Sequence, residues 1–133
     1  MPAVVVDTHT IVWYLAQDVR LSQRANDALD AATQSGEAIY VPAICLVELT
    51  YLVEKGRLSA DARDRLIDAI DDPERPARLA PMDRAVVEAV ARVSRAEVPD
   101  MPDRIVAATA FALGLPVISR DARIRASQVP SIW

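Results

Sequence analysis

The sequence predicts an α/β fold, a parallel sheet covered by helices on both faces. Short continuous runs rich in Val and Ile, typical of strands buried on both sides, alternate with longer segments of helical periodicity. The chain has only three glycines, and each follows a predicted helix, at the left-handed position where helices commonly end. Strands that alternate with helices imply a parallel sheet, here of four or five short strands.

The first half of the chain predicts, in order, a strand at residues 3–6, helices at 8–16 and 21–35, a strand at 38–41 and a helix at 43–55. The two strands are continuous apolar runs rather than alternating ones, as expected for the middle of a parallel sheet. Gly36 and Gly56 end the second and third helices.

The second half predicts, in order, a helix at 60–71, a strand at 77–81, helices at 83–96 and 103–113, a strand at 116–119, a helix at 122–126 and an edge strand at 129–133. Gly114 ends the helix before the fourth strand, and Pro116 prevents that helix from continuing. Pro130 fits only an edge strand or the start of a strand.

Composition limits the class of protein. A chain of 133 residues with 52% hydrophobic side chains predicts one domain, residues 1–133, with a core of its own. The net charge of −4 argues weakly against a nucleic-acid partner, although acids gathered at a metal site would remove that objection. Cys45 is the only cysteine, which excludes a disulfide within the chain. No apolar run suggests a membrane span or a signal peptide, so we expect a cytoplasmic protein.

Four acidic residues lie where an unpaired carboxylate is costly to keep. Asp7 ends the first apolar run and Asp121 follows the run at 116–119, so each has an alternative role as a helix N-cap. Asp103 falls in the first turn of its helix, with Asp100 as the cap, where the helix dipole already favours an acid. Ligands of open α/β sheets bind beyond the carboxyl ends of the strands, so Asp7 and Asp121 can meet if their strands are neighbours.

Glu48 is the hardest of the four to explain without a function. It lies in a stripe of residues at helical spacing that consists of Ile44, Val47, Glu48, Tyr51 and Leu52. We expect this stripe to face the core. An acid in that position needs a positive partner, either a metal ion or an arginine in a structural salt bridge.

Together the acids predict a metal site. Two carboxylates ~5 Å apart repel each other by about 3 kcal/mol, so a cluster of three or four requires a cation to stay ionised. Oxygen ligands without cysteine favour Mg²⁺, or Mn²⁺, over zinc. Such a site polarises a phosphate and activates a water for hydrolysis.

Each of the four acids lies in a recognisable segment, and in chain order these read VVDTHTIVWYL at 5–15, VPAICLVEL at 41–49, PDRIVAATA at 102–110 and GLPVISRD at 114–121. In this order they resemble a PIN-domain ribonuclease, specifically the VapC-type toxin of a type II toxin–antitoxin system. The resemblance covers nearly the whole chain and implies a three-layer α/β/α domain with a Mg²⁺-dependent endoribonuclease site.

The resemblance also implies roles for individual residues. Asp7 and Asp103 would carry the metal most directly, and Glu48 and Asp121 would complete the acidic cluster. Around them, the residues implied to support the metal or its waters are Thr8, Ser119 and Asp100. His9 invites assignment as a general base, but the family does not need one, and we expect a structural role.

A protein partner is implied in the same way, an antitoxin whose peptide covers the site and an adjacent groove. Residues available to line that groove are Trp13, Tyr14, Leu52 and Leu58, although core packing explains each of them equally well. Toxins of this family commonly form homodimers.

Two other classes remain open. A different Mg²⁺-dependent phosphohydrolase on a doubly wound fold would share the strand-end acids, but a dehalogenase-like phosphatase would need an acid where His9 stands. A non-catalytic PIN-like module would serve binding alone, and retention of all four acids argues against it. The sequence identifies neither the RNA that is cut nor the antitoxin family, the number of metals or the oligomeric state.

Overall fold

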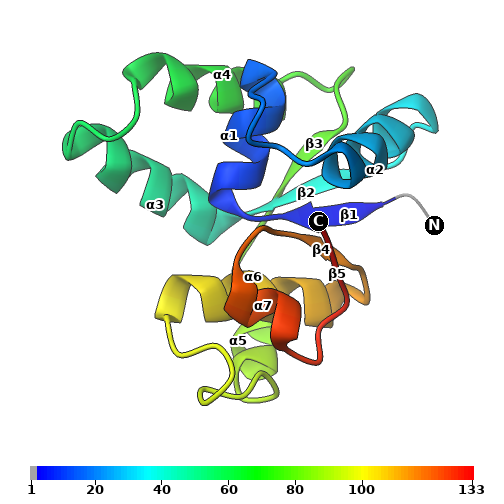
Figure 1. Ribbon diagram of the computed structural model, residues 1–133, viewed down its shortest axis with the longest axis vertical. Coiled ribbons are helices and arrows are strands. Elements are labelled where there is room, and N and C mark those ends of the chain that lie inside the picture. Colours follow the sequence, from blue (N-terminus) through cyan, green and yellow to red (C-terminus); the bar gives the residue numbers. More distant parts are fainter. Residues whose placement is uncertain (1–2) are drawn as a thin grey trace.

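Five parallel strands form the centre of the protein, in a computed structural model that describes residues 3–133. In chain order the elements are β1 (Val4–Val6), α1 (Thr8–Ala16), α2 (Gln23–Gln34), β2 (Ile39–Pro42), α3 (Ala43–Glu54), α4 (Ala60–Asp71), β3 (Ala77–Ala80), α5 (Arg84–Val90), α6 (Met101–Leu113), β4 (Val117–Ile118), α7 (Ala122–Ala126) and β5 (Ser131–Ile132). Figure 1 shows the predicted three layers, with α1 to α4 on one side of the sheet and α5 to α7 on the other. The predicted α/β class and parallel sheet are confirmed.

The strand order is β3-β2-β1-β4-β5, which puts the N-terminal strand in the middle. Val5 pairs with Tyr40 on one side and with Val117 on the other, and its side chain is fully buried. The tail strand β5 lies at an edge, as the proline before it requires. Helices cover both faces of β1, so a continuous run of valines is what this position demands.

The glycine predictions are confirmed. Gly36, Gly56 and Gly114 have φ of +73°, +72° and +67°, the left-handed conformation in which a side chain is strained. Gln17 also adopts this conformation, with φ of 54°, and ends α1 without a glycine.

Two predictions about helices are wrong. The helix expected over residues 83–96 ends at Val90, and the chain continues in turns, although Val93 is still buried. On α3 the buried side chains are Cys45 and Leu49, whereas Val47 and Tyr51, at 53% and 60% exposure, lie at the surface. The predicted stripe therefore borders the core instead of facing it, and Glu48 stands at the edge of a pocket.

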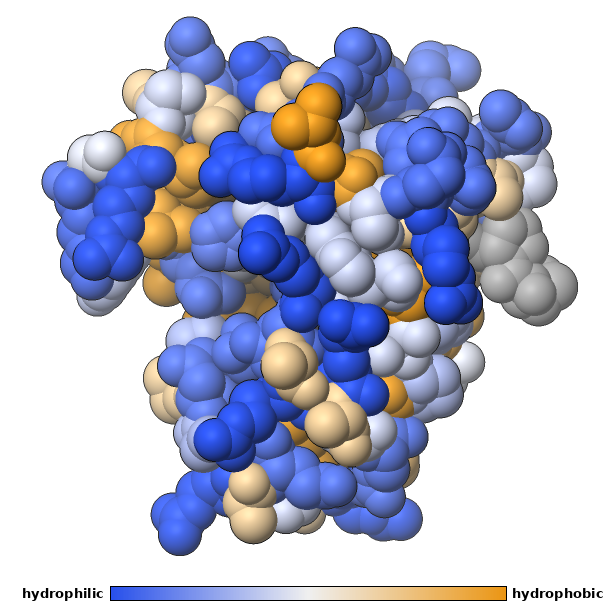
Figure 2. Space-filling model, viewed as in Figure 1, coloured by the Kyte–Doolittle hydropathy of each residue, from blue (hydrophilic) through white to orange (hydrophobic). Residues whose placement is uncertain are grey.

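The surface is predominantly polar in the face drawn in Figure 2, where hydrophilic side chains occupy the middle, between the two helical layers. Hydrophobic side chains gather there mainly between α3 and α4. None of the helices within residues 3–133 has both the length and the apolar character needed to cross a membrane.

Candidate active site

The candidate site lies between β1 and β4, the point in the sheet at which the chain switches from one side of β1 to the other. From β1 the chain proceeds outward to β2 and β3 on one side, and β4 and β5 occupy the other side. This arrangement opens a crevice at the carboxyl ends of β1 and β4, the usual ligand position in open α/β sheets. Asp7 follows β1 directly and Asp121 follows β4 after two residues. The two strands are hydrogen-bonded neighbours, so the condition for their acids to meet is satisfied.

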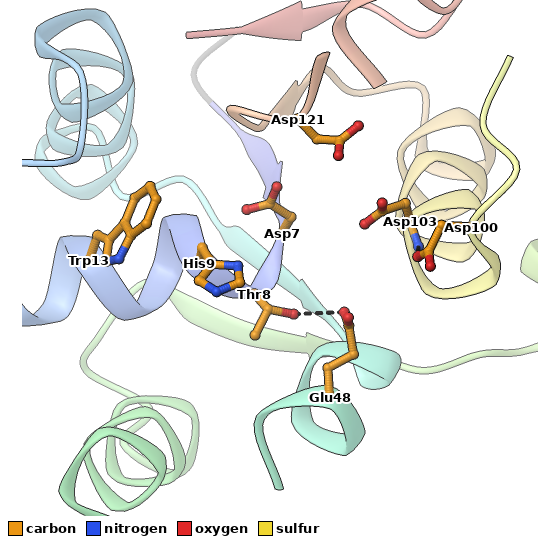
Figure 3. A pocket seen from close by; sticks show the side chains of 8 residues that line it. All are labelled: Asp7, Thr8, His9, Trp13, Glu48, Asp100, Asp103 and Asp121. Carbon is orange, nitrogen blue, oxygen red and sulfur yellow. Dashed lines mark hydrogen bonds between the residues drawn. The ribbon is translucent and has the colours of Figure 1, made fainter. Parts of the chain in front are cut away.

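A pocket of about 370 Å³ occupies this crevice, and its walls come from β1, α1, α3, α6 and the start of α7. The lining residues are Asp7, Thr8, His9, Trp13, Glu48, Asp100, Asp103 and Asp121. In Figure 3, Asp103 and Asp121 point into the space beside Asp7, and Glu48 points toward it from α3. Five of the eight lining side chains are carboxylates.

Asp7 is held by two neighbours and has two functions. Its Oδ1 accepts a hydrogen bond of 3.0 Å from the backbone N–H of Thr10, which caps α1. Its Oδ2 accepts a hydrogen bond from the hydroxyl of Ser119, a fully buried residue just after β4. The Thr10 hydroxyl donates to the carbonyl of Ile118 at 2.9 Å and joins the same two elements. The capping role is therefore real and leaves Asp7 beside the pocket.

Glu48 accepts a hydrogen bond of 2.9 Å from the hydroxyl of Thr8. The salt bridge to arginine that would explain this acid structurally is not found within residues 3–133, where the ion pairs are Arg20 with Asp18 and Arg84 with Glu88. Thr8 is buried, so this contact fixes the glutamate against the start of α1.

The remaining acids enter from two helix N-termini. Asp100 caps α6 by accepting from the N–H of Asp103, and Asp121 caps α7 by accepting from two backbone N–H groups. Asp103 itself lies in the first turn, half-buried, as predicted. Among the described residues, its carboxylate has no hydrogen-bond or ion-pair partner.

The crowding of carboxylates changes their acidity. The pKa of Asp103 is raised to about 7, first by burial and then by the negative charges of Asp121, Asp100, Glu48 and Asp7, in that order of importance. Burial also raises the pKa of Glu48, and the Thr8 hydroxyl bound to its carboxylate partly opposes this effect. None of these carboxylates forms an ion pair with a basic side chain within residues 3–133, and their negative charges repel one another.

Whether these residues fit a metal depends on their donors and on their positions. The donors are carboxylate and hydroxyl oxygens, which suit Mg²⁺ or Mn²⁺, and a divalent cation would relieve the repulsion that raises the pKa of Asp103. As the side chains stand, no three Asp, Glu, His or Cys groups within residues 3–133 are close enough together to hold one ion. The donor set fits the ion in its chemistry, and the side chains would have to move closer together to bind it.

Beside the pocket lies an aromatic and basic cluster, centred on Trp13, that the sequence did not predict. Trp13 is only 6% exposed, and its ring lies 5.5 Å from that of His9 and 6.1 Å from that of Trp133. The guanidinium carbons of Arg20 and Arg120 lie 5.0 Å and 5.8 Å from its centroid. In the sequence, the one sign of this cluster is that Arg120 directly precedes the site residue Asp121.

The four residues predicted to line a partner groove are not gathered in one place. Trp13 packs in the core and lines the carboxylate pocket. Tyr14 is half-buried, donates to Asp30 at 2.9 Å and lines a separate apolar pocket of about 270 Å³. Leu52 and Leu58 are half-buried at the end of α3 and just beyond it.

Comparison with known proteins agrees with this architecture. A family model described as PIN domain matches residues 4–129. Ribonuclease VapC22 of Mycobacterium tuberculosis (strain ATCC 25618 / H37Rv) is 25% identical over 136 residues, covering 100% of both chains. VapBC2 from Rickettsia felis, solved with a promoter DNA fragment, has a similar fold, with a TM-score of 0.71, 13% identity and 97% and 96% coverage. VapBC-5 from Mycobacterium tuberculosis gives a TM-score of 0.60 at 23% identity, with 98% of each chain covered.

Proposed function

Because the PIN-domain model matches residues 4–129, this chain belongs to the PIN-domain family, and on that premise we propose that it is a metal-dependent endoribonuclease acting as the toxin of a toxin–antitoxin pair. The observation that carries the proposal is the pocket with five carboxylates at the carboxyl ends of β1 and β4. The full-length relative from Mycobacterium tuberculosis bears the name ribonuclease.

The proposed ligands of Mg²⁺ or Mn²⁺ are Asp7 and Asp103, with Glu48 and Asp121 bound directly or through waters. When bound, the ion would polarise the phosphodiester and lower the pKa of a water. Asp103, half-buried and without a partner in the described chain, is the acid with the most to gain from a cation. Its pKa of about 7 means that protons compete with the metal near neutral pH.

Other residues position these carboxylates. Ser119 and Thr10 hold the two oxygens of Asp7, and Thr8 holds Glu48. Asp100 and Asp121 are each tied to a helix N-terminus, which restricts how far they can turn. We propose that Ser119, Thr8 and Asp100 act in this supporting way, because their contacts are made to the acids or to the backbone that carries them.

The partner of the proposed toxin is an antitoxin protein. Support comes from the solved proteins of similar fold, which are described as VapBC or FitAB assemblies and as a toxin–antitoxin complex from Klebsiella pneumoniae. We propose that the antitoxin peptide covers the carboxylate pocket, which Trp13 of the predicted groove residues lines. A homodimer is proposed on family resemblance alone.

The test is cleavage of single-stranded RNA by the purified, antitoxin-free protein. We expect cleavage with Mg²⁺ or Mn²⁺, none in excess EDTA, and recovery when the metal is restored. Asp61→Asn is the matched control for Asp103→Asn, because both acids lie in the first turn of a helix but Asp61 is exposed and outside the pocket.

Two results would contradict the proposal. Full cleavage after verified metal removal would exclude the metal-dependent reaction. A folded protein that binds an antitoxin but cleaves no RNA with either metal would favour the alternative of a non-catalytic PIN-like module.

A further inference from the structure

Arg120 lies next to the carboxylate pocket, in the segment between β4 and α7 and directly before the lining residue Asp121. Its sequence neighbours both belong to the site, since Ser119 bonds to Asp7 and Asp121 lines the pocket. Its guanidinium carbon lies 5.8 Å from the centroid of the Trp13 ring, and Trp13 also lines the pocket. The backbone of Arg120 is thus anchored at the site, and its guanidinium lies over the ring of Trp13, a residue of the pocket wall.

The two guanidiniums near Trp13 differ in their availability. Arg20 makes a two-pronged contact with Asp18, at 3.0 Å and 2.8 Å, so its charge is already matched. Arg120 is exposed and makes no ion pair with any acid among residues 3–133. Of these two cations, Arg120 is the one available to an anionic ligand.

A polyanion that enters this pocket meets five carboxylates, and repulsion between like charges opposes its approach. A metal ion would neutralise the scissile phosphate, but the neighbouring phosphates of the strand need cations of their own. Arginine suits this task because its planar fork of N–H groups matches two phosphate oxygens. The contact with the Trp13 ring restricts the motion of the Arg120 side chain before RNA binds, so less conformational entropy is lost on binding.

We propose that Arg120 is a substrate-binding residue that contacts an RNA backbone phosphate next to the one being cleaved, with Trp13 holding its guanidinium beside the pocket. This inference rests on the proposed ribonuclease function and adds the position at which the RNA strand leaves the carboxylate pocket. Arg120 does not take part in bond cleavage itself, so its loss acts on RNA binding more than on the chemical step.

The experiment measures steady-state cleavage of a short single-stranded RNA of mixed sequence, in Mg²⁺, over a range of NaCl concentrations. The variants are Arg120→Gln, Arg120→Lys and, as control, Arg125→Gln, which removes the same charge from an exposed residue in the last turn of α7. For Arg120→Gln we expect KM to rise about 10-fold, the size of one lost charge-assisted phosphate contact, with kcat nearly unchanged.

The salt dependence gives a second readout that loss of stability would not change. One phosphate contact fewer should make the plot of log(kcat/KM) against log[NaCl] less steep by about 0.7 for Arg120→Gln. Arg120→Lys keeps the charge and should keep the slope, with a smaller rise in KM. Arg125→Gln should match the wild type in both quantities, and all variants should melt near the wild-type temperature.

If the wild type cleaves RNA and Arg120→Gln has the KM and salt slope of the Arg125→Gln control, the inference about Arg120 is wrong and the ribonuclease function stands. A large fall in kcat with unchanged KM would also overturn it, because Arg120 would then act in the chemical step. If the wild type cleaves no RNA with either Mg²⁺ or Mn²⁺, both proposals fall together.

Discussion

Asp103→Asn tests whether the acids of the pocket repel one another in the metal-free protein. The pKa of Asp103 is raised from 3.8 to about 7, so folding forces a carboxylate into a place where its charge is disfavoured. At about 1.4 kcal/mol for each tenfold change, the rise corresponds to at most about 4 kcal/mol. Asp103 is half-buried and solvent screens part of this effect, so we expect Asp103→Asn to stabilise the metal-free protein by about 1–3 kcal/mol near pH 8.

The pH dependence follows from the sign of the shift. Below about pH 4 the carboxyl is protonated in both states and the mutation changes little. Between about pH 4 and pH 7 the unfolded chain loses this proton more readily than the folded one, so the wild type loses stability relative to the variant as the pH rises. Above about pH 7 the difference is constant, because Asp103 is ionised in both states.

The assay is urea unfolding of both proteins in EDTA at several pH values, followed by circular dichroism. Asp61→Asn serves as the control, because Asp61 is an exposed acid in the first turn of α4, where the helix dipole stabilises its charge. Its replacement should lower the free energy of unfolding by at most about 0.5 kcal/mol. Mg²⁺ should stabilise the wild type and have less effect on Asp103→Asn. A variant less stable than the wild type near neutral pH, or a difference that does not vary with pH, would refute the reasoning.

Three further predictions concern the same pocket. Glu48→Gln should fold with nearly wild-type stability, because the Thr8 hydroxyl can still donate to the amide oxygen. Its Mg²⁺ affinity, measured by calorimetry, and its rate of RNA cleavage should both fall. Unchanged Mg²⁺ affinity would remove Glu48 from the site. Mg²⁺ affinity should weaken as the pH falls below about 7, because protons compete for Asp103, and Asp103→Asn should lose most of this dependence; equal pH profiles for the two proteins would contradict it. His9→Ala should retain most of the cleavage rate, since the exposed His9 ring packs on Trp13; a loss of about 100-fold or more would instead assign it general-base catalysis.

Local patterns in the sequence were sufficient to predict most of the fold. The valine run of β1, the glycines at +73°, +72° and +67°, and Pro116 before β4 act through backbone conformation and burial, which adjacent residues largely determine. A general rule for open α/β sheets indicated that Asp7 and Asp121 can meet if their strands are neighbours, and the structure supplies that condition by pairing β1 with β4. The helix over 83–96 was predicted too long, because its apolar spacing continues to Val93 while the backbone turns after Val90.

Tertiary structure alone decided which face of α3 is covered. The spacing of Val47, Glu48 and Tyr51 is that of a buried stripe, but the neighbouring elements pack on Cys45 and Leu49 instead. Apolar residues at helical spacing predict that one face of the helix is buried, but they do not predict where the neighbouring elements pack. Glu48 therefore owes its place beside the pocket to packing, and its partner is the Thr8 hydroxyl rather than an arginine.

By itself the sequence determined the parallel α/β class, the order of its elements and the acids at their ends, because backbone conformation and hydrophobic period are properties of short segments. It could not determine the cluster beside the pocket, where Trp13 from α1 and Arg120 from beyond β4 come together. Nor could it give the pKa of Asp103, which is raised by its burial and by charges brought from three other elements. Contacts between residues distant in sequence, and the dielectric surroundings that they create, exist only once the chain is folded.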